Sequence, residues 1–134
     1  MSDMGRVTRN IVSGYQRDRV FRSSLYASES RQLITDFNGA IPADRSIVQA
    51  VWQTWENQCI AMGPAEVSER SVQIRVAAQY SGRSRIKLDV TLDNGDVFSA
   101  WHIIRVMGAP YFDNPGWVTG PRKVVATIPA VELP

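Results

Sequence analysis

Three consecutive segments of alternating residues, joined by tight turns, constrain the fold of this chain most strongly. In residues 71–80 (SVQIRVAAQY), valine and isoleucine side chains alternate with glutamine and arginine. A period of two places alternate side chains on opposite faces of a β-strand, so this segment predicts a half-buried strand. Residues 85–92 (RIKLDVTL) repeat the pattern after the turn SGRS. Residues 97–106 follow the turn DNGD, whose Asn-Gly pair favours a type I′ hairpin.

Further strands are expected on both sides of these hairpins. Residues 31–37 (RQLITDF) and 46–56 (SIVQAVWQTWE) are strand candidates, the second with Val48, Ala50 and Trp52 on its core face. A short strand over 58–62 is expected to end at Gly63-Pro64. Short strands with turns every 8 to 12 residues, without helical periodicity, predict an all-β, antiparallel, Ig-like sandwich. A jelly roll is the alternative.

The chain divides into three zones. Residues 1–28 show no clean period, and residues 5–28 carry several arginines against one acid, Asp18, so we expect an extended basic arm. Residues 29–108 are the expected sandwich. Residues 109–134 hold five of the seven prolines, which predicts a second arm with at most one edge strand, in RKVVATIPA.

Composition excludes several classes of protein. The 134 residues fit one domain, and no apolar run approaches the ~20 residues of a membrane helix. The N-terminus lacks the apolar stretch of a secretory signal, and Cys59 is the only cysteine. We therefore expect synthesis in the cytoplasm and no membrane partner. A basic arm could contact nucleic acid or an acidic protein surface, and the small net charge of +2 without lysine-rich density favours the second over nucleic acid.

Candidates for catalysis are few. His102, the only histidine, lies mid-strand between apolar neighbours, and no G-x-S-x-G elbow occurs. One histidine and one cysteine cannot make an ordinary zinc site, and no glycine-rich phosphate loop precedes a helix. We expect a core histidine and a buried, inert cysteine. The sequence thus predicts a non-enzyme with no metal, cofactor or small-molecule ligand.

The strand FSAWHIIRV, residues 98–106, is apolar on both faces. Phe98, His102 and Ile104 share the expected core face, which leaves Trp101 and Ile103 on the other. A sandwich strand needs one apolar face, so the second face predicts a contact surface, covered by a neighbouring subunit or by the chain's own arm. The predicted interface residues are Arg17, Arg19, Phe21, Arg22, Trp55, Trp101, Ile103 and Trp117.

The order of motifs from Gln32 to Val106 resembles the Ig-like domains of structural proteins in tailed bacteriophages. LITDFNGAIPADRSIVQAVW contains a strand ending in Asp, a loop with Gly and Pro, and a strand ending in Trp. Alternating strands with glycine turns follow. The resemblance implies a core role for Trp52, turn roles for Gly82 and Gly95, and a virion component without catalytic residues. His102, Trp101 and Ile103 depart from its last strand.

These observations predict a structural or accessory protein of a tailed-phage virion, such as a capsid decoration or a neck or tail component. Its expected partners are further copies of itself, other virion proteins, or both. The alternative is a carbohydrate- or cell-surface-binding module, in which Trp55, Trp101 and Trp117 would stack on sugars.

Overall fold

The structure, a computed structural model, describes residues 7–13, 20–54, 59–108 and 122–128. These ranges contain strands and no helix, and hence none long and apolar enough to span a membrane. The strands are β1 (Val7–Ser13), β2 (Val20–Tyr26), β3 (Ser30–Gly39), β4 (Ile47–Thr54), β5 (Ile60–Val67), β6 (Ser71–Ala78), β7 (Gly82–Leu92), β8 (Val97–Met107) and β9 (Lys123–Thr127).

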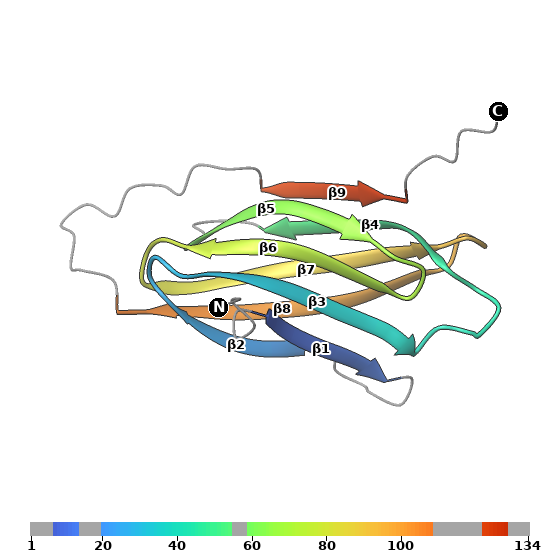
Figure 1. Ribbon diagram of the computed structural model, residues 1–134, viewed down its shortest axis with the longest axis horizontal. Coiled ribbons are helices and arrows are strands. Elements are labelled where there is room, and N and C mark those ends of the chain that lie inside the picture. The colour runs from blue at the N-terminus through green and yellow to red at the C-terminus, as the bar shows by residue number, and fades with distance from the viewer. Residues whose placement is uncertain (1–6, 14–19, 55–58, 109–121, 129–134) are drawn as a thin grey trace, which may run out of the picture.

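The strands form two sheets that pack face to face as a sandwich (Figure 1). The four-stranded sheet has the order β1-β3-β6-β5, and the five-stranded sheet has the order β2-β8-β7-β4-β9. Within them, β3-β6-β5 and β8-β7-β4 reproduce the B-E-D and G-F-C arrangement of immunoglobulin sandwiches. The predicted all-β, Ig-like fold is confirmed. Its sheets are antiparallel except at the pairs β1–β3 and β2–β8, which are parallel.

The core lies between the two sheets and follows the predicted alternation. Trp52 on β4 is 1% exposed, as expected for the core tryptophan of this fold. The inward residues of β6, β7 and β8 are buried around it: Val72, Ile74, Val76, Ile86, Leu88, Val90, Ala100, Ile104 and Val106. Burying this apolar surface is the main force that holds the sheets together.

The predicted N-terminal arm differs from the structure. Residues 7–13 and 20–26 are strands, each added in parallel to the edge of a sheet. In β2, Phe21 and Leu25 point inward while Arg22, Ser24 and Tyr26 point outward. A polar residue at the inward position 23 obscures the apolar alternation in the sequence. Pairing with an exposed sheet edge satisfies the backbone of these strands whatever their side chains, which explains why composition alone missed them.

Two local predictions also need correction. β5 does not end at Gly63-Pro64 but continues to Val67, with its register shifted between Met62 and Ala65. Because β5 is an edge strand, a bulge can accommodate the missing N–H of Pro64. A second register shift, between Ile47 and Gln49, buries Ile47 and leaves Val48 only half-buried. The predicted edge strand near the C-terminus is confirmed as β9, paired with β4.

Arg70 organises the connection between β3 and β4. Its guanidinium donates hydrogen bonds to the carbonyl oxygens of Ile41 and Arg45, each at 2.9 Å, and of Asn38 and Pro42, each at 3.2 Å. It also donates to the Asn38 side chain. A guanidinium with five N–H donors suits a loop whose carbonyl groups converge on one point.

Candidate contact surface on the five-stranded sheet

The outer face of the five-stranded sheet brings together side chains from β2, β8 and β7. Strand register sets them in three neighbouring rows across the sheet: Val20–Trp101–Lys87, Arg22–Ile103–Arg85 and Ser24–Arg105–Arg83. Because side chains alternate across a strand, these residues share the face turned away from the core. We call these nine residues the outer surface.

The inward and outward faces of β8 match the prediction. Ala100, His102 and Ile104 are buried in the core, whereas Trp101 and Ile103 are half-buried on the outer surface. β2 belonged to the predicted arm, but it lies beside β8 in the sheet and does not cross over it. Within the described residues, therefore, β2 flanks Trp101 and Ile103 without covering them.

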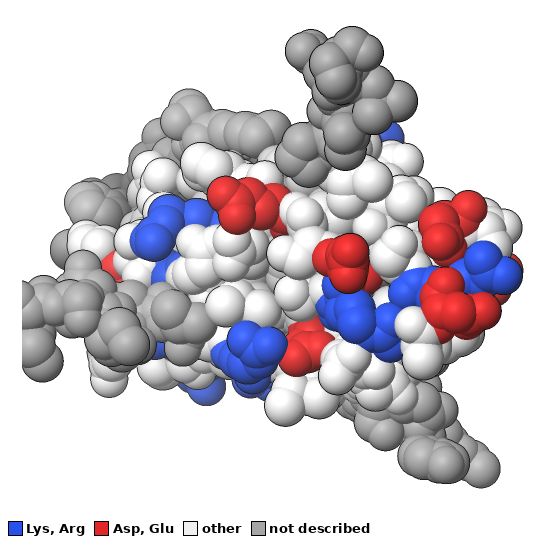
Figure 2. Space-filling model, turned by 45° about the vertical axis from the view of Figure 1, so that its right-hand side comes forward, with Lys and Arg blue, Asp and Glu red and all other residues white. Residues whose placement is uncertain are grey.

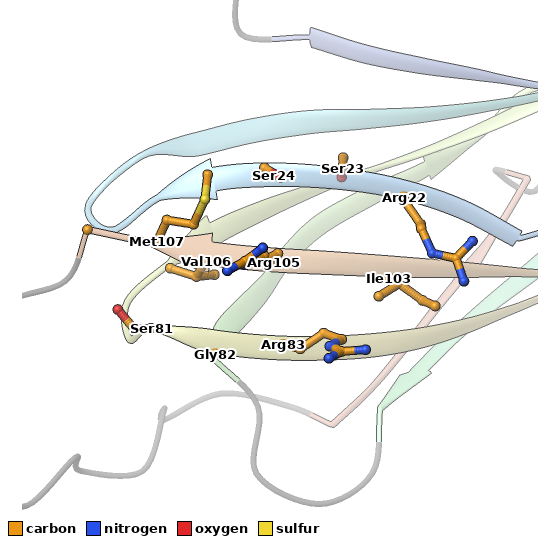
Figure 3. Close-up of a pocket in the computed structure, with 11 residues that line it drawn as sticks. Arg22, Ser23, Ser24, Ser81, Gly82, Arg83, Ile103, Arg105, Val106 and Met107 are labelled. Atoms are coloured by element: carbon orange, nitrogen blue, oxygen red, sulfur yellow. The ribbon is translucent and has the colours of Figure 1, made fainter.

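One end of the outer surface is hollowed into an open groove of 910 Å³. Arg22, Arg83 and Arg105 come from three adjacent strands, and Ile103 lies between them (Figure 3). Val106, Met107 and several serine and glycine residues complete the lining. The groove therefore combines guanidinium groups with an apolar floor.

The charges of this groove are of one sign. Arg83 and Arg105 are direct cross-strand partners, an arrangement that is destabilising for like charges. No acidic residue lines the groove, and none of Arg22, Arg83 and Arg105 forms an ion pair within the described part of the chain. Elsewhere charges do pair, as in the 2.8 Å contact between Arg9 and Asp36 on the four-stranded sheet. Figure 2 shows acidic and basic side chains intermixed over the face it presents.

His102 is a structural residue of the core. It is 2% exposed, and its ring stacks on Phe21 with centroids 5.7 Å apart. Asn10 Nδ2 lies 3.4 Å from Nδ1, and Thr35 Oγ1 lies 3.1 Å from Nε2. An amide NH₂ can only donate, so Nδ1 accepts, and Nε2–H of the neutral ring donates to Thr35. Burial lowers the pKa of His102 to about 4, which keeps the ring neutral.

Cys59 is also buried and unsuited to chemistry. Its thiol Sγ lies 3.6 Å from the Ser81 carbonyl oxygen, and burial raises its pKa. Gly82, with φ of 146°, passes so close that a Cβ there would lie 2.5 Å from Sγ. Within the described residues, no three His, Cys, Asp or Glu side chains gather in a way that could hold a metal ion.

The predicted interface residues have separate outcomes. Trp101 and Ile103 share the outer face, as expected, and Arg22, which was expected in an extended arm, lies beside Ile103 on the same surface. Phe21 is a correction, because it points inward and packs on the buried His102. Four more lie outside the described residues: Arg17, Arg19, Trp55 and Trp117.

Sequence reasoning missed the contribution of Arg83 and Arg105 to this surface. Both occupy outward positions of alternating strands, a signal that was present in the sequence. Their opposition across β7 and β8 depends on the hairpin register, and β2 brings Arg22 alongside.

Comparison with known proteins supports the fold. No protein-family model and no curated protein matches this chain. Among solved structures, PbICP-C in complex with falcipain-2 is similar with a TM-score of 0.52 and 10% identity, over 77% of this chain and 100% of that one. The cysteine protease inhibitor EhICP2 from Entamoeba histolytica has a TM-score of 0.46 and 8% identity, over 75% of this chain and 97% of its own. At 10% identity, the similarity to PbICP-C shows a shared fold alone.

Proposed function

We propose that this chain is a non-enzymatic structural or accessory protein of a tailed-phage virion, assembled through subunit contacts on the outer surface. The observation that carries the proposal is the second apolar face of β8, where Trp101 and Ile103 lie on the same surface as the basic groove around Arg83 and Arg105. The virion setting rests on the resemblance of the motif order between Gln32 and Val106.

The composition of the outer surface supports a protein partner. Tryptophan and arginine are enriched among residues that dominate binding energy at protein interfaces. Trp101 and Ile103 are already flanked by neighbouring strands, so a partner would complete their burial without reorganising the sheet. A preformed surface of this kind lowers the entropic cost of association.

The histidine and the cysteine support a role without catalysis. His102 is enclosed between the sheets, and Cys59 is a buried thiol with a raised pKa, so neither offers a reactive group to a substrate. PbICP-C, the solved structure similar in fold, is itself described in complex with another protein, falcipain-2. Such a sandwich can therefore act by binding.

Particle composition tests this proposal. We expect the chain in purified virions at a fixed ratio to the major capsid protein, measured by quantitative mass spectrometry. The variant Trp101→Ser/Ile103→Ser should reduce that ratio at least tenfold, whereas Gln73→Ser, on the outer face of the four-stranded sheet, should not. If the wild-type chain stays in the soluble lysate and is absent from particles, the virion role is wrong. If the variant binds particles normally but loses retention on polysaccharide columns, the carbohydrate alternative replaces it.

A further inference from the structure

The basic groove and an acidic hairpin lie at opposite ends of β7. The groove surrounds Arg83 near the first residue of the strand, and the turn after Leu92 carries Asp93 and Asp96. Eleven residues of extended chain separate the two ends by roughly 35 Å. One molecule thus presents a positive surface at one end of this strand and a negative surface at the other.

The hairpin is a rigid projection. Gly95 adopts a φ of 93°, its N–H donates to the Leu92 carbonyl, and the Leu92 N–H donates to the Asp96 carbonyl at 2.8 Å. The Asn94 side chain accepts from the Asp96 N–H at 3.0 Å. Asp96 is exposed, and Asp93 is 3.8 Å from Arg45, at the long end for an ion pair. Next to the turn, Val97 is 59% exposed.

The chemistry of the two ends is complementary. The groove offers the guanidinium groups of Arg22, Arg83 and Arg105 around the apolar Ile103 and Met107. The hairpin offers two carboxylates beside one exposed valine. Arginine binds carboxylates through paired hydrogen bonds, and an acidic ligand would relieve the repulsion between Arg83 and Arg105.

We propose that the groove of one copy binds the Asp93–Val97 hairpin of a second copy. This inference rests on the proposed function, for which it names one subunit contact. Donor and acceptor surfaces differ, so the contact is heterologous and leads to rings or to open stacks of subunits.

Single-stranded nucleic acid is the competing occupant of a basic groove. Proteins that bind it combine positive charge with aromatic side chains on which bases stack. None of the residues described as lining this groove is aromatic, and its floor is formed by Ile103 and Met107. A carboxylate hairpin with an apolar neighbour fits this lining better.

Charge reversal tests the contact. A groove variant, Arg83→Glu/Arg105→Glu, and a hairpin variant, Asp93→Lys/Asp96→Lys, should each weaken self-association of the full chain about 100-fold or more, because like charges would then meet. An equimolar mixture of the two should associate again. The reversed groove of one variant then meets the reversed hairpin of the other, and the unchanged hairpin of the first meets the unchanged groove of the second. Arg75→Glu/Arg122→Glu is the control with the same charge change as the groove variant, at exposed positions outside the groove.

Sedimentation velocity measures the self-association of each variant and of the mixture, and circular dichroism checks that each variant is folded. Recovery of association in the mixture supports the contact, because two misfolded variants would not rescue each other. The contact is ruled out if the mixture remains monomeric, or if either reversal leaves association unchanged. It is also ruled out if the groove variant loses only binding to a labelled oligodeoxynucleotide. In each of these cases the particle-composition experiment still decides the proposed function independently.

Discussion

At the scale of single residues, His102 links the two sheets through a polar contact in an otherwise apolar core. Its ring nitrogens face Asn10 and Thr35 of the four-stranded sheet, while its backbone belongs to β8 of the five-stranded sheet. A buried polar side chain is tolerated when its hydrogen bonds are made, and the neutral ring makes both. Protonation of Nδ1 would set a donor against the donor of Asn10.

This arrangement predicts a pH dependence of stability. The ordinary pKa of 6.5 applies to the unfolded chain, and the pKa of about 4 applies to the folded one. Between these values the unfolded state binds the proton more tightly, so the free energy of unfolding is highest above pH 6.5 and falls as the pH drops towards 4. The loss should be about 3 kcal/mol.

Urea unfolding at a series of pH values measures this effect. His102→Met fills a similar space without a titrating group, so its unfolding free energy should lose this slope while the slopes from carboxylates remain. Parallel curves for the two proteins would show that His102 does not titrate as described.

At the scale of elements, the connection between β3 and β4 depends on one side chain. Arg70→Met removes hydrogen bonds to four carbonyl groups and to Asn38, and we expect a loss of about 2–3 kcal/mol in the free energy of unfolding. Arg70→Lys should recover little of this, because an ammonium cannot reach the same acceptors at once. Chemical denaturation measures both.

The matched control for this prediction is Arg75→Met. Within the described residues its exposed side chain makes a single hydrogen bond, to Ser30 Oγ at 3.1 Å, so we expect a change within about 0.5 kcal/mol. An equal loss for Arg70→Met and Arg75→Met would contradict a special role for Arg70 in this loop.

Local pattern predicted those strands whose pairing is also local. The alternation in β7 and β8 and the Asn94-Gly95 turn were sufficient to place one hairpin and its buried face. The alternation in β6 also predicted a half-buried strand, but β6 and β7 lie in different sheets, so the expected tight turn SGRS leads from one sheet to the other instead of closing a hairpin. β2 escaped prediction because its partner β8 lies about eighty positions further along the chain, and sequence periodicity contains no information on such parallel pairing. The bulges in β4 and β5 escaped for a related reason, because only the partner strand defines a register shift.

The candidate surface was likewise predictable only where it depends on the local pattern of one strand. Trp101 and Ile103 stood out because they break the alternation of a half-buried strand. The groove could not be recognised in the sequence. It forms only because β2, β8 and β7 are neighbours in the sheet, which places Arg22 and Arg83 on either side of Ile103.

At the scale of the whole molecule, the outer surface distinguishes this sandwich from one whose outer faces carry only polar residues. It presents partly buried apolar residues and a groove lined by Arg22, Arg83 and Arg105, and an acidic hairpin lies at the far end of β7. Together these features are the basis of our proposal that the protein assembles with copies of itself. Since the complementary surfaces are charged, added salt should weaken the assembly by screening.

The mass of the purified 134-residue chain in solution tests this central claim most directly. Light scattering over a range of concentrations should give a mass above the 15.0 kDa of a single chain, rising with protein concentration and falling when salt is added. A mass of 15.0 kDa at every concentration and at low as well as high salt would contradict the account.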